Sequence, residues 1–182
     1  MSVKIGIAGP VGSGKTAIIE QLTNIFKDEY SLCIVTNDIY TKEDANYLKS
    51  HLNIDSNRII GVETGGCPHT AIRDDISANL KTIETLEQDF NPDIIFVESG
   101  GDNLSATFSY ELIDYYMYVI DVAQGSDIPR KKGAGLLFSD LLVVNKTDLS
   151  PYVDVNLESM EKDVKKTRKN KRHIKLAIDH IV

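Results

Sequence analysis

One stretch near the N-terminus decides the fold: Gly9-Pro10-Val11-Gly12-Ser13-Gly14-Lys15-Thr16. Just before it, Val3, Ile5 and Ile7 alternate with other residues, which predicts a strand in a buried sheet. Just after it, apolar residues recur at helical spacing from position 18 to position 26. A glycine-rich loop between a strand and a helix, ending in Lys-Thr, is the pattern of a phosphate-binding loop.

The residue types in this loop suit a nucleotide phosphate. Glycines let backbone N–H groups approach phosphate oxygens, and the N-terminus of the following helix adds partial positive charge. We expect Lys15 to reach the β- and γ-phosphates and Thr16 to offer its hydroxyl to Mg²⁺. The loop residues expected to bind the nucleotide are Gly9, Gly12, Ser13, Gly14, Lys15 and Thr16.

The rest of the chain alternates strand and helix patterns. Further strands are expected at 32–35, 58–62, 94–97, 116–122 and 141–144, and helices at 43–52, 70–86 and 153–167. The polar stretch 125–133 is expected to be a mobile loop without regular structure, and 174–178 to be a last strand or the stub of a helix. This order predicts an α/β fold of the P-loop NTPase type, with a mostly parallel central sheet and helices on both faces.

Composition limits the class of protein. A length of 182 residues suits one domain, expected to span 1–182. A net charge of -7 argues against a surface that binds nucleic acid or anionic lipid. We find no apolar run of membrane-span length and no signal peptide, so we expect a cytoplasmic protein without a membrane partner. Cys33 lies in an apolar run and is expected to be a buried small hydrophobe.

A basic run follows the last predicted helix. It consists of Lys165, Lys166, Arg168, Lys169, Lys171 and Arg172. Cations are favourable at a helix C-terminus, so the run can be a solvated helix end. The alternative is an interaction patch for an acidic partner.

Carboxylates follow three of the predicted strands. Because ligands of such sheets bind outside the carboxyl ends of the strands, Asp38, Glu63 and Glu98 are candidates for a Mg²⁺-nucleotide site. Asp38 and Glu63 are expected to hold Mg²⁺ directly or through water. Glu98 precedes two glycines, which suggests a segment that faces the γ-phosphate. We assign Lys15, Asp38 and Glu98 as the candidate catalytic residues.

The run Asn145-Lys146-Thr147-Asp148 follows the last strong strand pattern and indicates the base. A carboxylate at Asp148 can accept hydrogen bonds from both N1–H and the 2-amino group of guanine, and adenine offers no such pair of donors. We therefore expect GTP.

Cys67 and His69 form a candidate metal-binding pair. A thiolate and an imidazole one residue apart, with a proline between them, can both reach a soft or borderline cation. Two ligands cannot complete a coordination sphere, and the same pair from a second subunit can complete it. Glu63 lies four residues before Cys67, so nucleotide state and metal binding can be joined as in a switch.

With these motifs the chain resembles a known family, the urease accessory GTPases called UreG. The resemblance rests on segments 9–16, 35–44, 61–73, 98–107 and 145–148 and runs from the first strand to about residue 165. It implies a SIMIBI-class GTPase that hydrolyses GTP slowly, dimerises with GTP and nickel, and delivers Ni²⁺ to apo-urease together with other accessory proteins. The same resemblance implies that Asn145, Lys146 and Asp148 hold guanine. It also implies that Thr16, Asp38 and Glu63 surround Mg²⁺, and that Cys67 and His69 of two subunits bind one nickel. By ligand type the pair also accommodates Zn²⁺.

The C-terminal portion is expected to be atypical for this family from about residue 165 and shortened. Two other functions stay open from the residues. One is a small-molecule kinase that uses the same phosphate loop, and the other is a nucleotide-binding scaffold subunit that does not hydrolyse GTP. No glutamine stands in an obvious place to position the attacking water, so we expect slow intrinsic turnover.

Overall fold

The computed structural model describes residues 2–38, 42–65, 68–101, 104–169 and 171–177. A seven-stranded sheet forms its centre, in the order β3-β2-β4-β1-β5-β6-β7, and every neighbouring pair is parallel. The strands are β1 Val3–Ala8, β2 Leu32–Asp38, β3 Ile59–Glu63, β4 Ile94–Glu98, β5 Tyr115–Asp121, β6 Leu141–Asn145 and β7 Arg172–Lys175. The prediction of a mostly parallel α/β sheet is confirmed.

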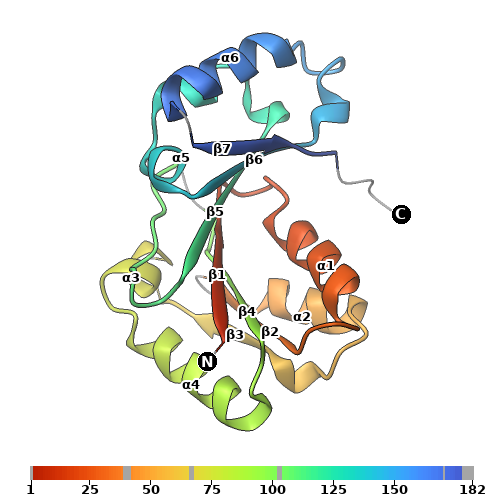
Figure 1. Ribbon diagram of the computed structural model, residues 1–182, viewed down its shortest axis with the longest axis vertical. Coiled ribbons are helices and arrows are strands. Elements are labelled where there is room, and N and C mark those ends of the chain that lie inside the picture. The colour runs from red at the N-terminus through yellow and green to blue at the C-terminus, as the bar shows by residue number, and fades with distance from the viewer. Residues whose placement is uncertain (1, 39–41, 66–67, 102–103, 170, 178–182) are drawn as a thin grey trace.

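Helices lie on both faces of this sheet. They are α1 Lys15–Phe26, α2 Glu43–His51, α3 Pro68–Arg73, α4 Ser77–Phe90, α5 Ala134–Phe138 and α6 Leu157–Arg168, with short 3-10 helices at Ser56–Arg58, Val122–Gln124, Ile128–Lys131 and Thr147–Leu149. Figure 1 shows α1 and α2 on one side of the central strands and α3 and α4 on the other. Within the described part of the chain, no helix combines the length and apolarity needed to cross a bilayer.

The alternation of side chains along β2 explains the two cores. Cys33 and Val35 pack with the core of α3, α4, α5 and α6, and Leu32 and Ile34 pack with the core of α1 and α2. Because both faces of the strand are buried, its sequence is a continuous apolar run. Cys33 is fully buried, as predicted, and burial raises the pKa of its thiol to about 11.

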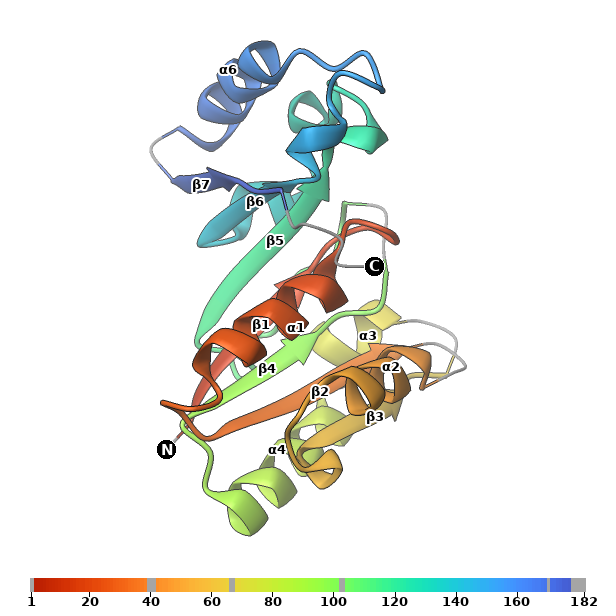
Figure 2. The ribbon, with the colours of Figure 1, turned by 90° about the vertical axis from the view of Figure 1, so that its right-hand side faces the viewer.

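The carboxyl ends of the strands meet at one edge of the sheet, which positions the site (Figure 2). The loop after β1 leads directly into α1, and at the same edge β2, β4 and β6 end at Asp38, Glu98 and Asn145. In an open parallel sheet this edge is the ligand-binding edge.

The helix predicted over 70–86 is wrong as a single helix, because the chain breaks between α3 and α4. The N–H groups of Asp74 and Asp75 both donate to the carbonyl of Thr70, which ends α3. The carboxylate of Asp75 then accepts from the hydroxyl and the N–H of Ser77, at the start of α4. These short polar side chains offer the backbone an alternative to a continuous helix.

Two other element predictions need correction. The helix expected at 153–167 begins at Leu157, because Asn156 caps it by accepting a 2.9 Å hydrogen bond from the N–H of Ser159. The stretch 125–133 is not free of regular structure. It holds the 3-10 helix Ile128–Lys131, in which Ile128 and Pro129 are buried against the core.

The C-terminal region also differs from the expectation of a solvated basic run. Arg168 is buried, with 3 % of its surface exposed, and its guanidinium donates to the carbonyls of Leu136, Ser139 and Arg172. Of the two alternatives for 174–178, the strand is observed, but earlier in sequence, as β7 paired with β6.

Candidate nucleotide site

Glycines are required at two positions of the phosphate loop. Gly9 has φ +153°, and a Cβ there would lie 2.1 Å from the carbonyl oxygen of Val119. Gly14 has φ +94°, and a Cβ there would lie 2.4 Å from the side-chain nitrogen of Asn145. Both the backbone conformation and the close approach exclude a larger residue. The loop therefore packs directly onto β5 and the end of β6.

Lys15 is held beside this loop. It is the first residue of α1, and 7 % of its surface is exposed. Its ammonium group donates a 3.3 Å hydrogen bond to the carbonyl of Pro10, at the start of the loop. The side chain thus folds back toward the backbone that the sequence predicts to surround the phosphates.

Three polar side chains from different elements converge next to the loop. The hydroxyl of Thr16 donates to Glu98 at 2.7 Å and lies 3.3 Å from a carboxylate oxygen of Asp44. Glu98 is fully buried, and this burial is the main reason that its pKa is raised to about 7. The positive charge of Lys15 lowers the pKa, and the negative charge of Asp44 raises it. Asp44, on α2, is a site residue that the sequence reasoning missed.

The arrangement fits a hydrated cation beside a phosphate. The second carboxylate oxygen of Glu98 is buried and has no hydrogen-bond partner within the described ranges. An orphaned buried carboxylate oxygen is costly unless a water or an ion satisfies it. The Thr16 hydroxyl and these carboxylates are oxygen donors of the kind that Mg²⁺ prefers.

Asp38 and Glu63 lie side by side at the ends of β2 and β3, where they are register partners. Thr64 joins these ends by donating from both its N–H and its hydroxyl to the carbonyl of Asp38, at 2.9 and 3.1 Å. The Glu63 carboxylate is exposed and lies 3.6 Å from the ammonium of Lys42. Across the described residues, no three His, Cys, Asp or Glu side chains are grouped closely enough to hold a metal ion.

The residues predicted to bind guanine lie against the phosphate loop. The Asn145 amide donates to the carbonyl of Ser13 at 3.0 Å, and the Lys146 ammonium donates to the carbonyl of Gly12 at 2.6 Å. Asp148 is exposed on the 3-10 helix that follows. The structure therefore brings Asn145 and Lys146 to the loop, with contacts to its backbone that the sequence did not predict.

Of the candidate metal pair, Cys67 lies outside the described residues. His69 is partly buried in the first turn of α3, and its Nε2 lies 3.4 Å from the hydroxyl of Ser105. Ser105 belongs to the segment that follows β4, the strand that ends at Glu98. Sequence reasoning did not predict this proximity.

A buried polar chain joins the nucleotide site to α3. Asn37 donates to the backbone carbonyl of Glu98 at 2.9 Å, and Asn79 donates to the Asn37 side-chain oxygen at 2.8 Å. Asn79 also donates to the carbonyl of Ala71 in α3, at 2.9 Å. Both asparagines are fully buried. No local sequence pattern singles out Asn79, which lies among the apolar positions of an amphipathic helix pattern.

A parallel sheet with a glycine-rich loop between β1 and α1, and with polar side chains at the carboxyl ends of its strands, defines a P-loop nucleotide-binding protein. Comparison with known families agrees, because the family model described as CobW/HypB/UreG, nucleotide-binding domain, matches residues 3–175. The urease accessory protein UreG of Aliarcobacter butzleri is 77 % identical over 174 residues, covering 96 % of this chain and 89 % of that protein. UreG of Lysinibacillus sphaericus is 58 % identical over 173 residues, covering 94 % and 83 %. The chain belongs to the CobW/HypB/UreG family and, within it, to the urease accessory proteins UreG.

Solved structures support the fold. The hydrogenase maturation factor HypB of Archaeoglobus fulgidus superimposes with a TM-score of 0.79 at 22 % identity, covering 97 % of this chain and 81 % of that chain. HypB of Helicobacter pylori, solved in complex with nickel, gives the same TM-score at 21 % identity, covering 97 % and 79 %. At these identities the likeness concerns the fold alone.

Proposed function

We propose that this protein is a GTP-hydrolysing metallochaperone that binds nickel and delivers it to apo-urease during urease maturation. The observation that carries the proposal is the buried chain from Glu98 through Asn37 and Asn79 to α3, because it joins the candidate nucleotide site to the helix that holds His69. The 77 % identity to a protein named urease accessory protein UreG supports the same function.

In this proposal the phosphate loop and Lys15 bind the GTP phosphates, and Asn145, Lys146 and Asp148 bind guanine. Thr16, Asp38 and Glu63 are the proposed ligands of Mg²⁺, and Asp44 and Glu98, which lie against the Thr16 hydroxyl, would supply further oxygen donors at the same place. When bound, the ion would neutralise charge on the transferring phosphate. Lys15 adds positive charge at the same place. Lys15, Asp38 and Glu98 are the proposed catalytic residues, and we expect the intrinsic hydrolysis rate to stay well below about 1 s⁻¹ without partners.

Nickel is the cargo, and Cys67 and His69 from two chains are its proposed ligands. A thiolate and an imidazole suit Ni²⁺ and also Zn²⁺, so either ion can compete for the site. Because each chain supplies two ligands, metal binding requires a two-fold homodimer. GTP binding would favour that dimer, and hydrolysis would release the metal to urease and its other accessory proteins.

The test is the molar mass by light scattering in Mg²⁺ with a nonhydrolysable GTP analogue, with and without Ni²⁺. We expect a dimer only when both ligands are present. Cys67→Ala and His69→Ala should each abolish metal-dependent dimerisation while leaving nucleotide affinity unchanged. The matched control is His51→Ala, which removes an exposed histidine of α2 and should dimerise like the parent protein.

Two results would contradict the proposal. A monomer under all conditions, with the nucleotide bound, would separate nucleotide binding from metal-dependent assembly. Phosphorylation of a small metabolite at the expense of GTP would instead identify a kinase.

A further inference from the structure

A basic groove lies at the edge of the sheet opposite the nucleotide site. It has a volume of about 860 Å³ and is lined by the first residues of three strands, Tyr115, Leu141 and Arg172, and by lysines at the end of α6 and the start of β7. Because the strands are parallel, their first residues lie at the far edge from the phosphate loop. The cations of this basic groove are Lys165, Lys169, Lys171 and Arg172.

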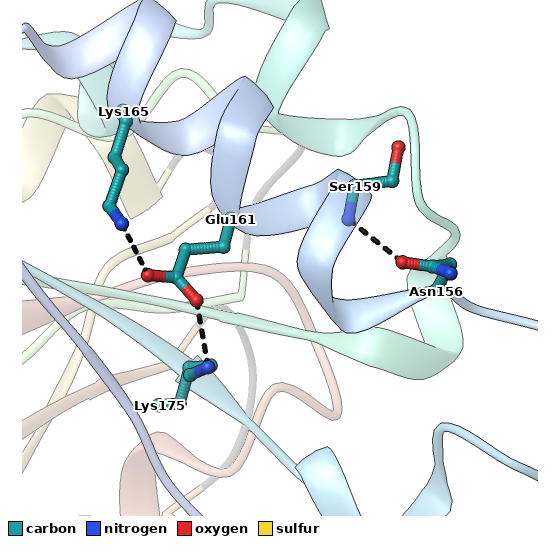
Figure 3. Close-up of polar contacts among 5 residues, drawn as sticks. All are labelled: Asn156, Ser159, Glu161, Lys165 and Lys175. Carbon is teal, nitrogen blue, oxygen red and sulfur yellow. Dashed lines mark hydrogen bonds and ion pairs between the residues drawn. The ribbon is translucent and has the colours of Figure 1, made fainter.

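Three of the four cations of this groove, Lys169, Lys171 and Arg172, have no carboxylate partner among the described residues. Among the described residues that line it there is no carboxylate, although the whole chain carries a net charge of -7. Lys165 pairs with Glu161 at 2.7 Å, an arrangement that Figure 3 shows beside Lys175. The side chains of Lys169 and Arg172 are exposed and have no hydrogen-bond or ion-pair partner within the described ranges. Positive potential is therefore concentrated in this groove, although the chain as a whole is acidic.

The buried guanidinium of Arg168 holds this groove in shape. It donates to the carbonyl of Leu136 and the hydroxyl of Ser139, after α5, and to the carbonyl of Arg172, at the start of β7. One side chain thus ties α6, the end of α5 and β7 together. The backbone that carries the flanking cations at 169 and 172 is held by these bonds, so ligand binding has to order their side chains but not this backbone.

An aromatic pocket adjoins the basic groove and shares Tyr115 and Lys171 with it. Its volume is about 740 Å³, and its walls include Tyr110 and Phe138, which are 95 % and 61 % exposed. Exposed aromatic side chains around a concave site are typical of protein-binding surfaces.

The acidic side chains of the aromatic pocket already have partners. Asp114 accepts a 2.8 Å hydrogen bond from the N–H of Lys4 and lies 3.6 Å from its ammonium. Asp140 accepts a 2.8 Å hydrogen bond from the N–H of Tyr116. By contrast, Lys171 uses its ammonium only on neutral carbonyls, those of Leu137 and Phe138, within the described part of the chain. The shared border of the two cavities is therefore favourable for an anion.

We propose that the basic groove and the aromatic pocket form one docking surface for an acidic segment of a partner protein, in which carboxylates flank an aromatic or aliphatic anchor. The carboxylates would pair with Lys169, Lys171 and Arg172, and the anchor would enter the pocket beside Tyr110 and Phe138. Charge complementarity would speed association and orient the segment. Because the surface lies at the opposite edge from the phosphate loop, the partner and a nucleotide can bind at the same time.

The test uses the full chain and a fluorescein-labelled peptide in which glutamates flank a single phenylalanine, measured by fluorescence anisotropy. The double variant Lys169→Glu/Arg172→Glu should weaken peptide binding by about tenfold or more. Its control is Lys49→Glu/Lys81→Glu, which makes the same change in net charge at exposed lysines of α2 and α4 and should change the affinity less than about twofold, since distant exposed charges are screened. Bound nucleotide should leave the peptide affinity of the parent protein unchanged.

The anchor is tested separately. Binding should weaken when the peptide phenylalanine is replaced with serine, and also when the protein carries Tyr110→Ala. The control is Tyr152→Ala, which removes an aromatic side chain that is 85 % exposed but lies outside the two cavities, and it should not weaken binding. An NMR titration of the parent protein with the peptide needs no variant. The amide chemical shifts that change should belong to the lining residues of the two cavities. Equal weakening by both charge-reversal pairs, shift changes spread over the surface, or equally tight binding of a single-stranded oligonucleotide would overturn the proposal.

Discussion

The side-chain amide of Asn79, on α4, donates a 2.8 Å hydrogen bond to the side-chain oxygen of Asn37, on β2. The same amide group donates to the carbonyl of Ala71 on α3, and Asn37 donates to the carbonyl of Glu98 on β4. Two buried asparagines therefore connect one sheet edge with two helices. The geometry of the nucleotide site and the position of α3 depend on the same pair of side chains.

Asn79→Ala should lower the free energy of unfolding by about 1–3 kcal/mol, because the Ala71 carbonyl and the Asn37 oxygen lose their buried donor. Urea unfolding measures this change. The control is Asn24→Ala, at an exposed position on α1, where a change within about 0.5 kcal/mol is expected. Equal losses in the two variants would show that the buried chain adds nothing to stability.

Lys15→Ala should weaken binding of a fluorescent GTP analogue by roughly tenfold to a hundredfold, because a hydrogen bond to a charged group contributes about 1.5–3 kcal/mol. The fold should be retained, since within the described part of the chain the Lys15 ammonium makes one hydrogen bond, to the Pro10 carbonyl. Lys27→Ala, at the C-terminal end of the same helix, is the matched control and should bind like the parent protein. Unchanged affinity of the Lys15 variant would place the phosphates elsewhere.

Asn145→Ala should also weaken nucleotide binding, by about tenfold, since the Ser13 carbonyl loses its 3.0 Å hydrogen bond and the loop is less well fixed. A titration with the same GTP analogue measures this effect, with Asn24→Ala as the exposed asparagine control. A full loss of folding, seen by circular dichroism, would instead assign Asn145 a structural role.

The ion-pair cluster on α6 predicts a pH dependence of stability. Hydrogen bonds from Lys165 and then Lys175 lower the pKa of Glu161 from 4.5 to about 2 (Figure 3). A carboxyl group whose pKa is depressed in the native state stabilises it above the unfolded pKa, and this contribution is lost as the pH falls through the native value.

Glu161→Gln should therefore lower the midpoint temperature of thermal unfolding at pH values above 4.5, and it should have no effect on this temperature near pH 2. The measurement is the difference in midpoint between parent and variant at low ionic strength, where surface charges are least screened. Glu84→Gln, on the exposed face of α4, should show no such pH-dependent difference. A constant difference across this range would mean that Glu161 acts through packing.

Cys33 should be chemically inert in the native protein, because burial raises the pKa of its thiol to about 11 and only the thiolate is nucleophilic. In a Cys67→Ala variant, which leaves Cys33 as the one remaining cysteine of two, an aromatic disulfide reagent should react only after denaturant is added. Prompt reaction of the native variant at neutral pH would show that the Cys33 core opens readily.

The sequence by itself determined the features that depend on neighbouring residues. The loop at 9–16 lies between a strand and a helix that each show their own periodicity, so the α/β fold and the position of the phosphate loop followed from local pattern. The strands predicted at 94–97 and 141–144 were found as Ile94–Glu98 and Leu141–Asn145, because buried parallel strands have a continuous apolar signal.

Only the tertiary structure decided which polar side chains meet. Asp44 reaches Thr16 across 28 residues, and Asn79 reaches Asn37 across 42 residues, and no local pattern encodes such partners. Arg168 looked like one cation of a solvated run, but its acceptors lie on α5, at Ser139 between α5 and β6, and on β7. Backbone periodicity is fixed by residues a few positions apart, whereas hydrogen bonds across a sheet edge depend on strand order and register, which arise only when the chain is folded.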